Sequence, residues 1–293
     1  MARILAIGIA TLDIINSVSR YPDEDDEVRA VSQRLCRGGN ATNTLVVLSQ
    51  LGHTCHWGGV LADEPDANHI EADLLRHAIN TDAVTRLSQG KVPTSYITHN
   101  LANGSRTIVH HRDLPEYRFA AFREIDLAPF DWLHFEGRNV AETLQMLLWA
   151  RAQYPALPIS IEIEKERPDI QQLFAHANLL LFSKPFALGR GHHHATGLLD
   201  AMRPLAPQAA LVCTWGAAGA WAIDRRGQEE YSTSIAPPQV VDTLGAGDTF
   251  NAAMIDSQIS GLSLGASLTA ACHLAGRKCG HQGLDFILKG TVS

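Results

Sequence analysis

The chain has 293 residues, of which 45% are hydrophobic and 19% charged, with a formal net charge of −7 and a pI near 6.0. A chain of this length and apolar content buries a large core, and we expect one main domain over residues 1–293. The acidic balance argues against duplex nucleic acid or an anionic membrane surface as the principal partner, because both require a basic protein face.

The first apolar stretch is "RILAIGIATLDII", which begins at Arg3. It is interrupted by Asp13 and lacks the charged start and the cleavage site of a signal peptide, so we interpret it as a buried first strand. The five cysteines are odd in number and form no C-x-x-C pair, which indicates neither a disulfide framework nor a zinc site. A reducing, cytoplasmic location is therefore expected.

Apolar runs of strand length recur along the chain with helical stretches between them. They begin at residues 3, 38, 158, 177 and 209. Strands that alternate with helices predict an α/β fold with a mostly parallel central sheet covered on both faces.

Two segments depart from this alternation. Residues 13–36 are polar and acidic, and residues 94–111 contain two strand-like runs around an Asn-Gly pair, which is a strong hairpin signal. Together they predict a small second sheet that acts as a lid over one edge of the main domain. The alternative is two surface excursions without a role.

The stretch "VVDTLGAGDTF", residues 240–250, predicts a helix that begins at its glycines, Gly245 and Gly247. Apolar residues follow at helical spacing from Phe250. Unpaired amides at a helix start attract an anion, and glycine allows a phosphate to approach the backbone. The alternative is a glycine-rich turn in which Asp248 only complements the helix dipole. The chain contains no Walker loop.

An aspartate beside an anion site suits phosphoryl transfer. The amides of Ala246, Gly247 and Asp248 would hold the charge that develops on the transferring group. The Asp248 carboxylate would face the acceptor hydroxyl, orient it and accept its proton. The two groups would then act on opposite sides of one reaction.

"VVDTLGAGDTF" and "RGGNATN", residues 37–43, together resemble the ribokinase (PfkB) family of sugar kinases. In that family the second glycine pair lies in the sugar site, and G-A-G-D forms the anion hole and carries the catalytic base. Further stretches, among them "NGSRTIVHH", "SIEIEKERP" and "AGRKCGHQG", are similar to its ketohexokinase (hepatic-type fructokinase) branch. This likeness runs nearly end to end.

The resemblance implies a ribokinase-like three-layer α/β/α fold and an ATP-dependent, Mg²⁺-requiring kinase that converts fructose to fructose 1-phosphate. It also implies K⁺ activation through the loop that begins at Asp242, and a homodimer formed through the lid sheets. A kinase of another ketose, aldose or sugar acid remains an alternative. So does a sugar- or nucleotide-binding regulator that has lost catalysis, although the intact "GAGD" argues against it.

The sugar site is expected at the glycine turn and helix that begin at residue 38. Asn40 and Asn43 stand three residues apart and project from one side of that helix, and their amides can both donate and accept hydrogen bonds. The alternative is a helix cap. Asp13 follows the first strand, where ligands bind in open α/β sheets. The resemblance implies that the sugar contacts are Asp13, Asp25, Gly39, Asn40 and Asn43.

An acidic protein that handles ATP needs local cations, and Arg106 and Arg138 are candidates because a guanidinium can bond two phosphate oxygens. The alternative is a surface salt bridge for each. With the resemblance, we expect Arg106 near the phosphates and lid, and Glu136 with Arg138 as a paired wall of the site.

In "SIEIEKE" two carboxylates, Glu162 and Glu164, alternate with isoleucines and therefore share one strand face. They would organise hydrated Mg²⁺, or they are the solvated face of an edge strand. The family's N-x-x-E magnesium motif falls on Ser183 and Phe186 here, which leaves the placement of the metal open.

The resemblance places further residues against the nucleotide. "TWGAAGAW", 214–221, predicts two strands around a glycine turn, and "AGRKCG", 275–280, predicts part of a late helix. The alternatives are an ordinary hairpin and close helix packing. The nucleotide contacts implied in these stretches are Gly216, Gly219, Ala275, Gly276 and Cys279. The histidines 192–194 are interpreted as a polar loop or helix start, because three consecutive residues cannot share a helix face.

Overall fold

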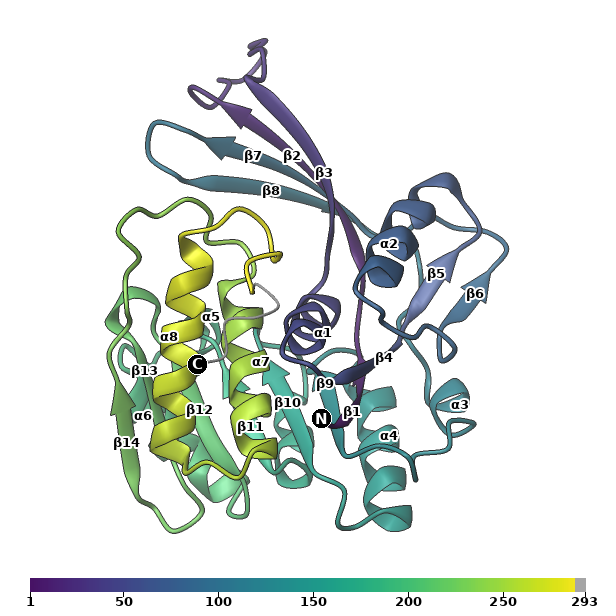
Figure 1. Ribbon diagram of the computed structural model, residues 1–293, viewed down its shortest axis with the longest axis vertical. Helices are drawn as coiled ribbons and strands as arrows, with labels where there is room; N and C mark the ends of the chain where they lie inside the picture. The colour runs from purple at the N-terminus through teal and green to yellow at the C-terminus, as the bar shows by residue number, and fades with distance from the viewer. Residues whose placement is uncertain (288–293) are drawn as a thin grey trace.

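The computed structural model describes residues 1–287, and an eight-stranded sheet forms its centre (Figure 1). The sheet has the order β14-β13-β12-β11-β10-β9-β1-β4. Six strands are parallel, and β13 and β14 are antiparallel at one edge. The strands are β1 (Arg3–Ile7), β4 (Thr54–Gly58), β9 (Trp132–Glu136), β10 (Ile159–Ile163), β11 (Leu179–Phe182), β12 (Ala210–Thr214), β13 (Ala220–Ile223) and β14 (Glu229–Ser232). The predicted α/β class with a mostly parallel sheet is confirmed.

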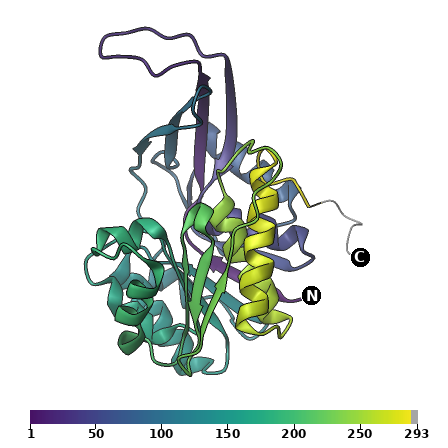
Figure 2. The ribbon, with the colours of Figure 1, turned by 90° about the vertical axis from the view of Figure 1, so that its left-hand side faces the viewer.

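Helices cover both faces of this sheet (Figure 2). One face carries α1 (Asn40–Gln50), α7 (Ala246–Ile259) and α8 (Leu264–Cys279). The other carries α3 (Phe119–Phe122), α4 (Val140–Gln153), the 3₁₀ helix η1 (Ile170–His176), α5 (Lys184–Gly189) and α6 (Ala195–Met202). Two further 3₁₀ turns are η2 (Arg203–Leu205) and η3 (Gly216–Ala218).

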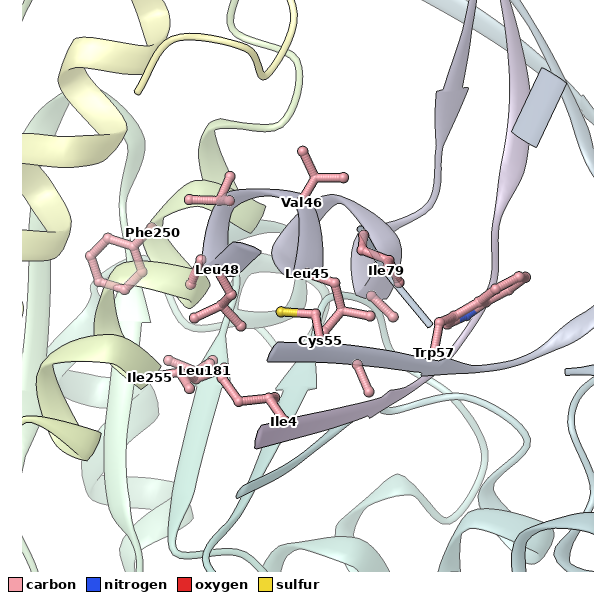
Figure 3. Packing of buried hydrophobic residues seen from close by; sticks show 14 of the residues in the cluster. Ile4, Leu45, Val46, Leu48, Cys55, Trp57, Ile79, Leu181, Phe250 and Ile255 are labelled. Carbon is pink, nitrogen blue, oxygen red and sulfur yellow. The ribbon is translucent and has the colours of Figure 1, made fainter. Parts of the chain in front are cut away.

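The alternation of side chains along the strands explains the two covered faces. In β11, Leu179 and Leu181 pack under α7, while Leu180 and Phe182 pack on the opposite face. Successive residues of a strand point to opposite sides, so a strand that is apolar throughout must be covered twice. Figure 3 shows Phe250 and Ile255 of α7 among the side chains of the first cluster. Each such buried side chain stabilises the fold by about 1.5–3 kcal/mol.

A separate four-stranded sheet stands above the body in Figure 1 and has the order β3-β2-β7-β8. Its strands are β2 (Thr11–Val18), β3 (Ser32–Gly38), β7 (Thr94–Asn100) and β8 (Arg106–His111). The central pair, β2 and β7, is parallel, and the two outer pairs are antiparallel. The two segments that break the α/β alternation in the sequence therefore pair with one another.

Beside these sheets, α2 (Pro65–Arg76) accompanies a two-stranded sheet of β5 (Val60–Ala62) and β6 (Thr85–Leu87). His194 is the N-cap of α6, so the expected helix start near the three histidines is confirmed. All five cysteines are free thiols. Within residues 1–287, none of the helices has the length and apolar character needed to cross a membrane.

Candidate active site

The N-terminus of α7 lies at the centre of the site. Gly245 is its N-cap with φ of 77°, a left-handed conformation that glycine adopts without strain. No side chain caps this end; the Ala246 amide donates to the carbonyl oxygen of Thr243 at 3.3 Å, so the amides of Gly247 and Asp248 are the ones that depend on another partner. A Cβ added at Gly247 would meet no atom within 4 Å. The predicted helix start is correct, and it faces open space.

Asp248 is in the first turn of α7 and is 7% exposed. Its Oδ2 accepts a hydrogen bond of 2.7 Å from Nδ2 of Asn43. Burial raises the pKa of Asp248 to about 7, and the carboxylates of Glu164 and Glu136 add to that effect, while the Asn43 bond opposes it. A carboxyl group with such a pKa is suited to accept a proton near neutral pH.

A second helix, α1, begins opposite α7. Its N-cap is Gly39, with φ of 102° and a Cβ position only 2.2 Å from the carbonyl oxygen of Ile9, so no other residue fits. The Asn40 amide donates to Glu162 at 3.1 Å and to Glu164 at 3.3 Å. Since neither Asn40 nor Asn43 caps the helix, the capping alternative is wrong for both.

Glu136, at the end of β9, anchors the start of α1. Its Oε1 accepts from the backbone N–H of Ala41 at 2.7 Å and of Ile9 at 3.1 Å. Burial raises its pKa to about 6, against the effect of Arg138, whose Nε lies 3.7 Å from Oε2. Glu136 therefore supports the site from behind.

The carboxylates of "SIEIE" share one face, because the Asn40 amide bonds to both. β10 lies between β9 and β11, so the alternative of a solvated edge strand is wrong. Burial, followed by the negative charge of Asp248, raises the pKa of Glu162 well above its usual range. Its buried Oε2 has no hydrogen-bond partner among the described residues, and those residues contain no group of three or more metal-binding side chains.

Ser183 and Phe186, at the positions of the family's magnesium motif, have structural roles. The Ser183 hydroxyl caps α5 by accepting from the Phe186 amide, and it donates to the carbonyl oxygen of Glu164. Phe186 is fully buried and stacks on Phe182. Neither residue offers a free metal ligand.

Two cavities meet at the start of α7. The larger, about 860 Å³, lies between the body and the lid sheet. The smaller, about 410 Å³, lies between α8 and the loops around β13. Arg106, Gly216 and Gly247 line both.

Most of the other predicted residues line one of these two cavities. Those that line the larger one include Asp13, Gly39, Asn40, Asn43, Arg138, Glu162, Glu164, Gly245 and Asp248. Those that line the smaller one include Gly219, Ala246, Ala275, Gly276 and Cys279. The alternative for Arg138, a salt bridge, also holds in part, because its Nε donates to Glu116 at 3.1 Å.

Three predicted residues do not line either cavity. Asp25 lies in an exposed loop between β2 and β3, with φ of 61°, and it lines neither cavity of its own chain. Glu136 is behind the site, as described above. Asp242 bonds instead to Leu244 and Gly283 amides.

A buried lysine of α8, Lys278, contacts the loop that begins at Asp242. Lys278 is fully buried, and its Nζ donates to the Asp242 carbonyl oxygen at 2.7 Å and lies 3.5 Å from Oδ2. Although burial opposes its ionisation, the Lys278 charge and two backbone amides lower the pKa of Asp242. Two Asp242 oxygens at the start of the loop expected to hold K⁺, the carbonyl oxygen and Oδ2, are thus already close to an ammonium group.

Sequence reasoning missed three cations that line the larger cavity, Lys165, Arg167 and Lys184. Lys184 also lies over the Trp215 ring, 5.4 Å from its centroid. A signal was present, because these residues directly follow β10 and β11, and ligands bind at the carboxyl ends of parallel strands.

The sequence of residues 1–289 matches the model of the pfkB family carbohydrate kinases. The chain belongs to the pfkB family of carbohydrate kinases. It is similar to the ketohexokinase of Mus musculus, with 41% identity over 98% of this chain and 99% of the relative. It is also similar to the ribokinase of Bacillus subtilis (strain 168), with 26% identity over 92% of this chain and 90% of the relative.

The fold of the family is also seen in the ribokinase of Arabidopsis thaliana, solved with ribose and ATP. That structure has a TM-score of 0.78 at 16% identity and covers 96% of this chain and 94% of its own. Family membership identifies the chain as an ATP-dependent sugar kinase. The predicted ribokinase-like fold and kinase activity are both confirmed.

Proposed function

We propose that the chain transfers the γ-phosphoryl group of ATP to the C1 hydroxyl of fructose. The observation that carries this proposal is the position of Asp248 at the uncapped start of α7, where the two cavities meet. The identity of the sugar is supported by the similarity to the mouse ketohexokinase. The reaction thus has an acceptor cavity, a base and an anion site at one point.

In this proposal the larger cavity holds the sugar. Asp13, Asn40 and Asn43 line it and offer both acceptors and donors to sugar hydroxyls. Asp248 orients the reacting hydroxyl and accepts its proton. The amides of Gly247 and Asp248, which have no partner at the helix start among the described residues, stabilise the charge on the transferring phosphoryl group.

The smaller cavity holds the nucleotide. Its lining of alanine, glycine and other small residues suits a flat adenine ring. Arg106 lines both cavities and would neutralise phosphate charge, and Lys165 and Lys184 supply further cations to the larger one.

Mg²⁺ would enter with ATP, since this ion is commonly held by one or two carboxylates, water and substrate phosphates. The unpartnered Oε2 of Glu162 fits such a role, with Glu164 on the same face. The ion would neutralise negative charge on the phosphates.

K⁺ activation stays a prediction from the resemblance, and the Lys278 contacts give it no support. Its test is the reaction rate with K⁺ replaced by an inert cation at constant ionic strength.

The decisive experiment is an ADP-release assay over a panel of ketoses, aldoses and sugar acids, with the phosphorylated position assigned by ³¹P NMR. Fructose with a 1-phosphate product is expected to give the highest kcat/KM. A higher kcat/KM with another sugar would replace fructose as the substrate. ADP release at an undiminished rate without any sugar, or in the Asp248→Asn variant, would argue against the transfer itself.

The rate should depend on pH through Asp248. Burial raises its pKa to about 7, and the base acts only when ionised, so kcat/KM should fall as the pH drops through that value. A profile that is flat from pH 6 to 8 would contradict the assignment.

We further propose that body and lid act as one kinase domain and that two chains pair through their lid sheets. β8 is exposed at every residue, and the sheet exposes Leu35, Tyr96 and Val109. A second chain could bring Asp25 to a sugar site that its own chain does not reach. Sedimentation should give a mass of twice 31.9 kDa, and a fully active monomer would refute the assembly.

The cytoplasmic location stays a prediction, testable by cell fractionation.

A further inference from the structure

A buried arginine lies behind the proposed sugar site. Arg37 is the penultimate residue of β3, next to Gly38, and its side chain is 3% exposed. Its Nε donates to Oδ2 of Asp73 in α2 at 2.6 Å. Its Nη1 donates to the Thr42 hydroxyl at 2.9 Å and to Oδ1 of Asn43 at 2.7 Å. The guanidinium thus connects β3 with α1 and α2.

The chemistry of these groups sets the direction of the Asn43 amide. A guanidinium can only donate hydrogen bonds, so the amide oxygen of Asn43 must face Arg37. The amide nitrogen must then face the other way, where it donates to Asp248 at 2.7 Å. The reversed amide would place an oxygen against the carboxylate and leave both contacts unpaired, which is costly in a buried site.

We propose that Arg37, held by Asp73, is a positioning residue that keeps the Asn43 N–H directed at the Asp248 carboxylate. This inference rests on the proposed function, in which Asp248 accepts the proton of the sugar hydroxyl. Arg37 lines neither of the two substrate cavities, so its effect passes through Asn43 and through its charge.

The charges around Asp248 make Arg37 important for a second reason. The charges of Glu164, which directly follows β10, and Glu136 of β9 act on Asp248, and Asp248 in turn raises the pKa of the buried Glu162 of β10. Asp13 of β2 is a further carboxylate within the field of Arg37. Burial, Glu164 and Glu136 raise the pKa of Asp248, whereas the Asn43 hydrogen bond and the Arg37 charge lower it.

Asp73 offsets part of the Arg37 charge. It also contacts Arg76 and His77, which reach Asp285 beyond α8. Although burial opposes it, the Arg37 charge lowers the pKa of Asp73, so Asp73 is ionised at neutral pH. Removal of either partner should therefore change the field at Asp248, with opposite sign in the two cases.

The test compares Arg37→Gln with Asp73→Asn. Arg37→Gln removes the positive charge, so the acid limb of kcat/KM should move up by about 0.5–1 pH unit. Asp73→Asn leaves Arg37 without its counter-charge, so the limb should move down. Loss of Arg37 should lower kcat about tenfold with a smaller change, about threefold, in the KM for the sugar. Arg37→Lys keeps the charge and a donor and should restore most of kcat.

Arg76→Gln is the matched control, because Arg76 contacts the same aspartate but is 58% exposed and does not contact Asn43. In the Arg76→Gln variant the acid limb of the kcat/KM pH profile should stay at the wild-type position. A second measurement does not depend on activity: the Asp248 carboxyl is titrated by ¹³C NMR with labelled aspartate, and its signal is assigned with Asp248→Asn.

Equal titration of Asp248 in all these variants, or shifts of one sign for both Arg37→Gln and Asp73→Asn, would overturn the inference. Loss of stability alone, measured as a lower Tm without these opposite shifts, would assign Arg37 a structural role. A wild-type chain that phosphorylates no sugar would instead refute the proposed function, and the NMR titration would still decide the role of Arg37.

Discussion

The helices α1 and α7 begin at the same site, yet their N-termini are satisfied in different ways. At α1 the protein supplies the anion, since the buried carboxylate of Glu136 accepts from the Ala41 amide. At α7 no side chain caps the helix, and the space beside Gly247 is open. Both ends attract negative charge through the helix dipole. The difference indicates that the α1 end is a structural anchor, whereas the α7 end is left for the substrate.

The sharpest way to test the α7 end is Asp248→Asn, which keeps the size of the side chain and removes the proton acceptor. Turnover should fall by roughly 10²- to 10⁴-fold, with a modest change in sugar affinity. Turnover within about threefold of the wild type, in a folded variant, would remove Asp248 from the mechanism.

Asp248→Asn should also be more stable than the wild type at alkaline pH. The folded-state pKa of Asp248 is raised to about 7 from 3.8, so the fold favours the protonated form and the wild type loses stability as the pH rises from about 4 to 7. Asn cannot ionise and avoids this loss. The Tm of the variant should therefore exceed that of the wild type at pH 8, and the difference should vanish at pH 4.

At the α1 end the side chains, rather than the amides, are expected to bind substrate. Asn40→Ala removes a sugar contact and should raise the sugar KM about 5- to 150-fold, corresponding to about 1–3 kcal/mol. Because the N-cap is Gly39, the helix itself should remain intact. A lower Tm with an unchanged KM would show that Asn40 serves the fold alone.

Gly247→Ala tests whether the open space at α7 is needed by a phosphate. The added methyl group meets no protein atom within 4 Å, so the Tm should be kept. It would project toward the phosphate, and we expect the KM for ATP to rise roughly tenfold. Gly189→Ala, which also has open space but ends α5, is the control. Equal ATP kinetics in both variants would contradict an anion site at α7.

The smallest effect on the reaction is expected at Glu136. Glu136→Ala leaves the amides of Ile9 and Ala41 without an acceptor and should lower the free energy of unfolding by about 1–3 kcal/mol. Glu136→Gln keeps an acceptor and should lose less. Chemical denaturation measures both. If the two variants lose kcat strongly and keep their stability, Glu136 acts on the substrate. The α1 end would then not be a purely structural anchor.

The contrast also shows what the sequence could and could not predict. The start of α7 and the turn before α1 were predictable, because glycines and helical spacing are local signals. The partner of the Ala41 amide was not, since Glu136 lies 95 residues away in the chain. For the same reason the sequence places Glu136 in the wall of the cavity rather than at the helix anchor. The role of Arg37 also depends on a distant partner, Asp73, which lies 36 residues away in the chain.

Asp25, whose role at the sugar stays a prediction, shows a second limit of the sequence. The resemblance assigned it to the sugar, but a loop position in a sequence carries no information about which site, or which copy of the chain, it reaches. Lys165, Arg167 and Lys184 were missed although the strands before them were recognised. The strand order, which brings β10 and β11 together at the centre of the sheet, was needed to place these cations at one edge.

The parallel pairing of β2 with β7 has a consequence for the order in which the molecule folds. The ladder joins Leu12 to Thr94, and the chain between them forms α1, β4 and α2. A ladder with such a large separation closes slowly, because the loop entropy is lost before any contact is gained. We therefore expect the hairpin of β7 and β8 to acquire its partner strands only after the body has condensed, so that the upper sheet is the last part of the nascent chain to mature.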